Sequence, residues 1–352
     1  MSTYTQKVKA SLLAAALGDA LGSFGECLHY KAVDREYPTL PPKEFNGRIL
    51  YSDDTALRLV LYDTILSSNV NAFAFAEQWS RNVLDNRVYW ISELYVASMI
   101  STGEDPHRIG HGNLLGDNAA MAADPIGALY PCFDELAALR AFETMSLCQS
   151  GKGLEGAMAV AAAVSRAMSP ESTTDDVVDA AGRWVSKGLK RKIEDAVAIA
   201  SNDGDPRGRL YDESLVEDGL TALIQNEINS PIPLESAKRL RNLSLGSGDV
   251  SMSISPFEVV PIAIGYVTRG KNDPLKSIRE AASFGRDCDT IAGIAGAILG
   301  SLHGMEGIPV SSLDLLPSEL VTKADQIATG MSEKARHVTE FGKIAGLTKD
   351  LF

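Results

Sequence analysis

The chain has 352 residues, of which 45% are hydrophobic and 22% charged, a composition that excludes disordered, collagen-like and coiled-coil proteins. Its 33 basic and 46 acidic residues give a formal net charge of -13, which argues against binding to a nucleic-acid backbone. Four cysteines without CxxC spacing are too few for a disulfide scaffold.

Two apolar stretches resemble membrane or export segments, but neither has the full pattern. The N-terminal stretch is interrupted by Asp19 and is followed by no A-x-A cleavage pattern. The second stretch, residues 290–304, is shorter than the roughly 20 residues that span a bilayer. We therefore expect a cytoplasmic protein with no membrane partner.

Helical periodicity runs through the chain, and period-two alternation is nearly absent, so we predict an all-α fold without a sheet. No linker or fixed-period repeat divides the chain, which favours one domain over residues 1–352. Residues 312–352 are the most polar part and are expected to be peripheral. The predicted helices, in chain order, are 9–21, 55–66, 72–83, 89–100, 136–147, 154–168, 175–188, 212–225, 256–267, 274–284 and 290–302.

The first chemically unusual segment is Gly18-Asp19-Ala20-Leu21-Gly22, followed by Glu26. Two glycines around a helix end predict a turn that can approach another part of the chain closely. Glu26 would then lie just beyond the helix C-terminus, where the helix dipole gives a carboxylate no stabilisation. A solvated loop acid is the alternative interpretation.

The second unusual segment is Ser52-Asp53-Asp54-Thr55, directly before an amphipathic helix. In the simpler interpretation, Ser52 caps this helix and the two acids complement its dipole. Adjacent carboxylates flanked by hydroxyls are also oxygen ligands of the kind that hard cations require. The segment alone leaves both interpretations open.

A glycine-rich segment lies in the middle of the chain, at residues 110–127. Its backbone N–H groups could bind phosphate or ribose oxygens. An ordinary surface loop with turn residues is an equally good interpretation of the same pattern.

The fourth segment is Asp287-Cys288-Asp289-Thr290, which again opens a helix. Inside that helix, glycines recur at residues 293, 296, 300 and 304. Glycine in a helix costs about 0.5–1 kcal/mol relative to alanine, so the repeat indicates close approach by another backbone. A buried, tightly packed helix would hold the two acids at its start rigidly, as a metal site requires.

These motifs together, in this order and separation, resemble the ADP-ribosylglycohydrolase family: GDALG with a glutamate four residues later, SDDT, and GRDCDTIAGIAGAILGSLHG. The resemblance runs from about residue 9 to residue 304, and residues 110–127 resemble the family's substrate-binding loop. It implies a single large domain of orthogonally packed helices around a buried glycine-rich helix, and a site for two Mg²⁺ or Mn²⁺ ions.

The resemblance also implies individual roles. The implied metal ligands are Ser52, Asp53, Asp54, Asp287, Asp289 and Thr290. The implied catalytic residues are Glu26, Asp54 and Asp289, with Glu26 as the leading general acid or base. The implied substrate-binding residues are Asp19, Gly112, Asn113, Gly116, Asp117, Asn118 and Met121.

The activity that follows is hydrolysis of an N-glycosidic ribosyl bond. Two divalent ions can bind the ribose hydroxyls and polarise a water, and nearby carboxylates stabilise the oxocarbenium-like transition state. The resemblance implies release of ADP-ribose from an ADP-ribosylated acceptor such as arginine. The expected partner is therefore an ADP-ribosylated protein or a small ribosyl substrate, and the oligomeric state is not predicted.

Three positions depart from the family pattern. Arg108 stands where an acid is frequent, Ala122 where a basic residue is frequent, and Arg286 where glycine is frequent. These changes leave the implied metal ligands intact but alter the pocket around them. One alternative is therefore a glycohydrolase of a small ribosyl compound or nucleoside. Another is a non-catalytic binding or structural protein, like the lens crystallin of the same family.

Overall fold

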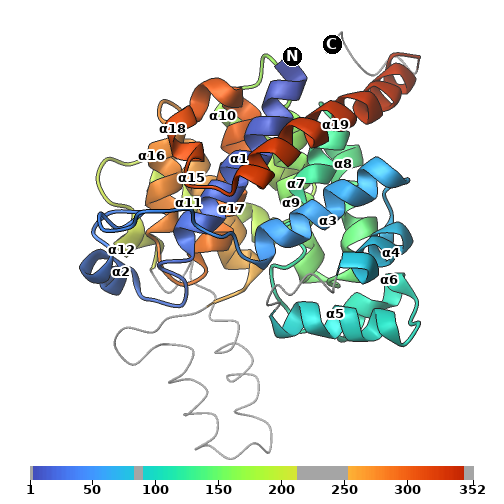
Figure 1. Cartoon of the computed structure of the whole chain (residues 1–352), viewed down its shortest axis with the longest axis horizontal. Coiled ribbons are helices and arrows are strands. Elements are labelled where there is room, and N and C mark those ends of the chain that lie inside the picture. The colour runs from blue at the N-terminus through green and yellow to red at the C-terminus, as the bar shows by residue number, and fades with distance from the viewer. Residues whose placement is uncertain (1–2, 83–89, 212–252, 345–352) are drawn as a thin grey trace, which may run out of the picture.

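A computed structural model describes residues 3–82, 90–211 and 253–344. These residues form helices and connecting loops and no β-strand, as the periodicity predicts. The two central helices are α1 (Thr3–Gly22) and α17 (Cys288–His303), which run side by side through the middle of the molecule (Figure 1). Nearly every residue of both helices is buried.

The glycines of α1 and α17 allow the two helix backbones to approach each other closely. A Cβ atom added to Gly18 or Gly22 would overlap the backbone of α17, and one added to Gly296 or Gly300 would overlap the backbone of α1. The close approach that the glycine repeat predicts is therefore confirmed. The turn predicted at residues 18–22 is wrong, because these residues form the end of α1.

The remaining helices surround this pair. Their bounds are α2 (Tyr30–Glu36), α3 (Asp53–Ser67), α4 (Ala72–Asn82), α5 (Ile91–Ser101), α6 (Pro106–Ile109), α7 (Asp124–Leu129), α8 (Asp134–Thr144), α9 (Lys152–Ala167), α10 (Thr174–Arg183), α11 (Lys187–Ala200), α12 (Arg207–Leu210), α15 (Pro256–Arg269), α16 (Pro274–Ala282), α18 (Val310–Leu313) and α19 (Ser318–Ile344). Short 3-10 turns occur at Gly110–Gly112, Met145–Leu147 and Gly304–Gly307.

The structure corrects one predicted helix. Residues 175–188 form not one helix but the end of one and the start of the next, because the chain leaves the helical conformation between Arg183 and Lys187. There, the Ser186 side chain accepts a hydrogen bond from the Leu189 N–H at 3.3 Å and caps α11. The irregular stretch at residues 28–51 contains the short helix α2, and the predicted helix 212–225 lies outside the described residues.

Helix α19 lies along the outside of α1 and also contacts α3 and α7 (Figure 1). Its apolar side, which includes Leu320, Ile327 and Met331, is buried against them. Among the described helices, none combines the length and the apolar character needed to cross a membrane.

Candidate functional site

A cavity of about 170 Å³ brings together the acids that the sequence singles out. It is bounded by the segment after α1, the starts of α3, α5 and α17, and the loop before α7. Its lining consists of Glu26, Cys27, Asp53, Asp54, Trp90, Ile91, Ser92, Glu93, Leu114, Asp117, Met121, Ile254, Arg286, Asp287, Asp289 and Thr290. A larger cavity of about 940 Å³ beside α16 contains none of the predicted site residues, so the smaller one is the candidate site.

The start of α3 places Asp53 and Asp54 in the cavity. The Ser52 Oγ accepts a hydrogen bond from the Asp54 N–H at 3.2 Å, so Ser52 caps the helix as the simpler interpretation predicts. Ser52 adjoins the cavity without appearing in its lining. Asp53 and Asp54 lie in the first turn of the helix, whose dipole stabilises negative charge.

Asp19, in α1, fixes the start of α3 by hydrogen bonds. Its carboxylate accepts hydrogen bonds from the Ser52 N–H at 2.9 Å, the Thr55 N–H at 3.0 Å and the Thr55 hydroxyl at 2.5 Å. The side chain is completely buried and does not line the cavity. In this structure Asp19 therefore anchors α3 to α1, although the family resemblance implies a substrate contact.

The segment after α1 is attached to the segment before α17. The Cys27 N–H donates to the Arg286 carbonyl and the Arg286 N–H donates to the Leu28 carbonyl, both at 2.7 Å. This pairing brings Glu26 to the acids at the start of α17, Asp287 and Asp289, close enough for its charge to affect them. Two parts of the chain about 260 residues apart thus form one wall of the cavity.

Arg286 occupies its unusual position at the cost of backbone strain. Its φ is +57°, in the left-handed region where glycine is favoured, which accounts for the glycine that is frequent there in the family. Its guanidinium forms a buried ion pair with Glu258, with 2.7 Å between Arg286 Nε and Glu258 Oε1. The side chain lines the cavity, and its charge is paired with that of Glu258.

The glycine-rich loop contributes two of its predicted residues to the cavity, Asp117 and Met121. Asn113 instead binds the backbone, because its Nδ2 donates to the carbonyls of Ser92 and Cys148. The Asn118 Oδ1 accepts a hydrogen bond from Gln149 at 2.8 Å. The other two predicted residues of this loop are Gly112, which is exposed, and Gly116, which is buried.

The sequence reasoning missed Glu93, which is 1% exposed and lines the cavity at the start of α5. The Ser92 hydroxyl lies 2.9 and 2.8 Å from the two Glu93 carboxylate oxygens. In the sequence, a glutamate in the first turn of a helix is what the helix dipole alone favours. No local pattern therefore distinguishes Glu93 from an ordinary surface acid.

Burial and mutual repulsion keep these carboxyl groups from ionising easily. Burial, followed by the charge of Glu93, raises the pKa of Asp53 to about 8. Burial and the charge of Asp289 raise the pKa of Asp54 well above its usual range. Burial and the charge of Asp287 do the same to the pKa of Asp289. The two helix starts are thus close enough for each to disfavour charge on the other.

A buried arginine, Arg58, lies close to the acids. The Arg58 Nε is 2.6 Å from the Asp124 Oδ1, and both side chains are almost completely buried. Arg58 also donates to the Met121 carbonyl and, at 3.3 Å, to the Thr55 hydroxyl. This residue therefore connects α3 to the end of the glycine-rich loop and places a positive charge near Asp54.

The donor atoms of the cavity have the chemistry of a site for hard cations. Within residues 3–82, 90–211 and 253–344, no three His, Cys, Asp or Glu side chains already stand where they could hold one metal ion. However, three buried carboxylate oxygens, Asp54 Oδ1, Asp117 Oδ2 and Asp289 Oδ1, have no hydrogen-bond partner among the described residues. Such oxygens are costly to bury unless something binds them, and Mg²⁺ and Mn²⁺ prefer oxygen ligands.

Comparison with known proteins identifies a family and agrees with the fold. The model of the ADP-ribosylglycohydrolase family matches residues 1–339. The chain is 27% identical over 327 residues to the protein YegU of Escherichia coli strain K12, covering 86% of this chain and 90% of YegU. It is 25% identical over 339 residues to the human ADP-ribosylhydrolase ARH3, covering 87% of each chain.

A solved structure has the same fold. It is described as an ADP-ribosylglycohydrolase-related protein complex and superposes with a TM-score of 0.67 at 16% identity, covering 94% of this chain and 99% of the other. The chain therefore belongs to the ADP-ribosylglycohydrolase family and is a glycosyl hydrolase. The family resemblance stated from the motifs is confirmed.

Proposed function

We propose that this protein uses two Mg²⁺ or Mn²⁺ ions to hydrolyse an N-glycosidic ribosyl bond and release ADP-ribose from an ADP-ribosylated acceptor such as arginine. The observation that carries the proposal is the meeting of the two aspartate pairs and Glu26 in one cavity. The ADP-ribosylhydrolase name of the human relative supports ADP-ribose as the group released.

The proposed ligands are oxygens at the two helix starts. When bound, the ions would supply positive charge that binds ribose hydroxyls and lowers the pKa of a water. The charge of Asp289 helps to raise the pKa of Asp54, and a divalent cation bound by both carboxylates would relieve this repulsion. The full proposed ligand set is Ser52, Asp53, Asp54, Asp287, Asp289 and Thr290.

Glu26 is the proposed general acid or base. Burial and the charge of Asp19 raise the pKa of Glu26, so it can hold or accept a proton nearer to neutral pH than a solvated glutamate can. It follows the end of α1 and is fixed in place by the pairing of Cys27 with Arg286. From there it can exchange a proton with the water or leaving group, while the surrounding carboxylates stabilise positive charge on the sugar.

The size of the cavity limits which part of the substrate it can enclose. Its volume of about 170 Å³ is below the roughly 300–1,000 Å³ of sites that enclose drug-sized ligands. A ribosyl group is the part that we propose to lie inside. The remainder would contact the cavity mouth, where Trp90, Ile91 and Leu114 expose 46%, 74% and 48% of their surface.

The same small volume favours a second candidate function, hydrolysis of a small ribosyl compound or nucleoside. The Arg108 side chain is 74% exposed and Ala122 is completely buried, so neither offers a charged group to a diphosphate inside the cavity. A nucleoside requires no such group. For both candidates, a cytoplasmic location and a single domain remain part of the proposal.

The test is to assay two substrate classes with purified protein in Mn²⁺ and in excess chelator. We expect ADP-ribose release from ADP-ribosylated arginine only with the metal, and little ribose release from nucleosides. The Asp289→Ala variant should lose more than about 100-fold in turnover, since even partners of metal ligands often contribute 10–100-fold. Faster nucleoside hydrolysis would favour the second candidate, and full turnover in chelator would disprove the metal requirement.

A further inference from the structure

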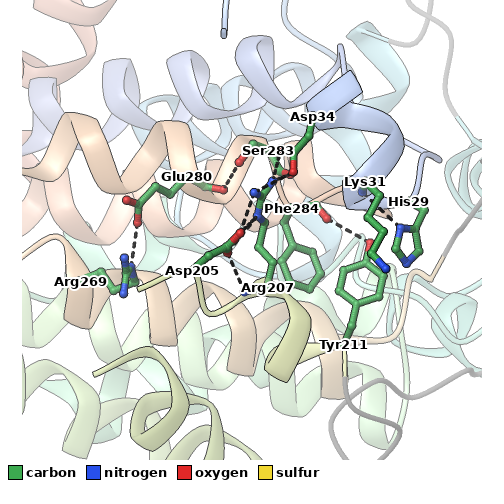
Figure 2. Close-up of polar contacts among 10 residues, drawn as sticks. All are labelled: His29, Lys31, Asp34, Asp205, Arg207, Tyr211, Arg269, Glu280, Ser283 and Phe284. Carbon is green, nitrogen blue, oxygen red and sulfur yellow. Dashed lines mark hydrogen bonds and ion pairs between the residues drawn. The ribbon is translucent and has the colours of Figure 1, made fainter. Parts of the chain in front are cut away.

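A second polar network lies outside the cavity. It contacts both the chain segment that follows Glu26 and the segment that precedes Asp287 and Asp289. Figure 2 shows its members, which come from α2, α12, α15, α16 and the loops beside them. At its centre is Arg207, the first residue of the short helix α12, which is absent from the cavity lining. No motif in the sequence points to this residue.

Arg207 binds α2 and the end of α16 with the same side chain. Its Nη1 and Nη2 lie 2.6 and 3.0 Å from the two carboxylate oxygens of Asp34 in α2. Its Nη1 also donates to the Ser283 carbonyl at 3.1 Å. A third partner, Asp205, accepts from its Nε and Nη2 and fixes the orientation of the guanidinium (Figure 2). Paired two-oxygen contacts of this kind are geometrically specific, because the planar guanidinium matches a carboxylate.

The two elements that Arg207 joins are close in sequence to the acids Glu26 and Asp287 that line the cavity. Asp34 lies eight residues after Glu26, and Ser283 lies four residues before Asp287. The Arg207 side chain is only 14% exposed, whereas the side chains of Asp34 and Asp205 are about half exposed. The guanidinium is therefore held between the two elements rather than extended into solvent.

A layer of aromatic rings continues from Arg207 to the cavity. The Arg207 guanidinium carbon lies 5.3 Å from the centre of the Tyr30 ring, and the Tyr30 and Tyr211 rings lie 4.9 Å apart. The Tyr211 hydroxyl donates to the Phe284 carbonyl at 3.0 Å (Figure 2). The Arg286 guanidinium carbon lies 5.8 Å from the Tyr211 ring centre. The contacts thus connect Arg207 to Arg286, which lines the cavity.

The segments held in this way have irregular backbones. Cys27, Gly285 and Arg286 all have positive φ, at +61°, +79° and +57°. Conformations of this kind persist in non-glycine residues only when the surroundings fix them. Among the described residues, the bridge-type backbone pairing between these two segments is a single isolated bridge, between His29 and Gly285, and not a ladder. External support is therefore needed to keep Glu26 at a fixed distance from Asp287 and Asp289.

We propose that Arg207 is a positioning residue that fixes the spacing between the Glu26 segment and the Asp287–Asp289 segment by joining Asp34 to the Ser283 carbonyl. It acts through these segments and does not touch the substrate. The part that concerns metal affinity rests on the proposed function, because it assumes that the acids bind divalent ions. The part that concerns the two segments depends on this chain's contacts alone.

Arg269 provides a matched control in the same network. Its Nε lies 2.7 Å from a Glu280 carboxylate oxygen (Figure 2). Its Nη1 donates to the Ala200 carbonyl at 3.1 Å. Like Arg207, it is an arginine with a small exposed fraction, 18%, that binds both carboxylate and backbone carbonyl oxygens. It joins α15, α16 and α11, none of which includes a residue of the Glu26 segment.

The experiment compares the full-length wild type with Arg207→Ala, Arg207→Lys and Arg269→Ala by two measurements. Hydrogen exchange reports the protection of the Cys27 and Arg286 amides, which bind across the two segments. Titration with Mn²⁺, followed by electron paramagnetic resonance, reports metal affinity. We expect Arg207→Ala to accelerate exchange at both amides and to weaken Mn²⁺ binding by about tenfold. Arg207→Lys should restore only part of each, because an ammonium is a point donor that cannot span the same partners.

Arg269→Ala should leave both measurements at wild-type values, even where its melting temperature falls as much as that of Arg207→Ala. Equal changes in the two variants, or unchanged amide protection in Arg207→Ala, would overturn the positioning role. A wild type that neither binds Mn²⁺ nor hydrolyses either substrate class would instead overturn the proposed function. In that case the exchange rates still decide whether Arg207 holds the two segments.

Discussion

The two helix starts that form the site carry similar sequences but are held in place differently. Before α3, Ser52 caps the helix and Asp19 binds three groups at residues 52 and 55. At the start of α17, Asp287 makes no side-chain capping hydrogen bond and follows two residues with positive φ. The first start is thus positioned by short polar contacts, and the second by close packing and by the loop that pairs with it.

This difference indicates that a pair of acids at a helix start need not be held by the helix itself. At α3, the capping interactions would orient the acids with little further support. At α17, the position of Asp289 depends on the contact with Gly22 of α1, where the backbones are too close for any side chain. Substitutions at the two sites should therefore have different consequences, which the following predictions use.

The largest effect is expected at Asp19. Asp19→Ala would leave the Ser52 N–H, the Thr55 N–H and the Thr55 hydroxyl buried without their acceptor, and should lower the free energy of unfolding by about 3 kcal/mol. Urea unfolding measures this loss. Asp19→Asn is the control, since its remaining carbonyl oxygen should recover part of it. A loss below about 1 kcal/mol for Asp19→Ala would contradict a structural anchor.

Removal of metal should have the next largest effect. At 100 times the dissociation constant, a ligand that binds only the folded protein contributes about 2.7 kcal/mol to stability. We therefore expect thermal unfolding at a higher temperature in saturating Mn²⁺ than in chelator. Identical melting temperatures in the two solutions would count against a metal site.

The melting temperature of the metal-free protein should also depend on pH. In the metal-free protein, the pKa of Asp53 is raised from its usual 3.8 to about 8. A raised carboxyl pKa means that the folded state binds the proton more tightly, so stability is lost as the pH rises from about 4 to about 8. In chelator, the melting temperature should thus be lower at about pH 8 than at about pH 5.5. Added Mn²⁺ should reduce this fall, because the ion replaces the proton.

A smaller effect is expected where α1 meets the start of α17. Gly22→Ala would place a Cβ atom against the backbone of Asp289 and should cost about 2 kcal/mol, within the range for overpacked cores. Because the displaced residue is a proposed ligand, Mn²⁺ affinity should fall as well. Gly293→Ala is the matched control, since its Cβ would lie 3.7 Å from the nearest neighbour. If Gly293→Ala were as destabilising, close approach of the backbones would not be the cause.

Much of the fold could be predicted because the helices carry their own signals. The glycine spacing in α17 predicts close contact with another backbone, which the structure finds at α1. The break between α10 and α11 was missed, because residues 184–186 hold neither glycine nor proline and the helical pattern continues across them. Helix α2 was missed because its seven residues lie within a long irregular stretch.

The candidate site could be predicted only in part. The order of the motifs predicts Glu26 and the two aspartate pairs as site residues, and all of them line one cavity in the structure. Glu93 could not be found, because an isolated glutamate in a first helical turn is ordinary. The ion pair between Arg286 and Glu258 joins residues 28 positions apart in the sequence, and no local pattern specifies such a pairing.

The sequence by itself determined the helical fold, the buried glycine-rich helix and the acids that open α3 and α17, because periodicity, capping and glycine spacing act over a few residues. The tertiary structure decided which of these side chains face the cavity and which support it. Asp19 anchors a helix, Glu93 joins the acids, and Arg207 connects segments far from it in the chain. These roles depend on contacts between distant residues, whose geometry exists only after the chain has packed.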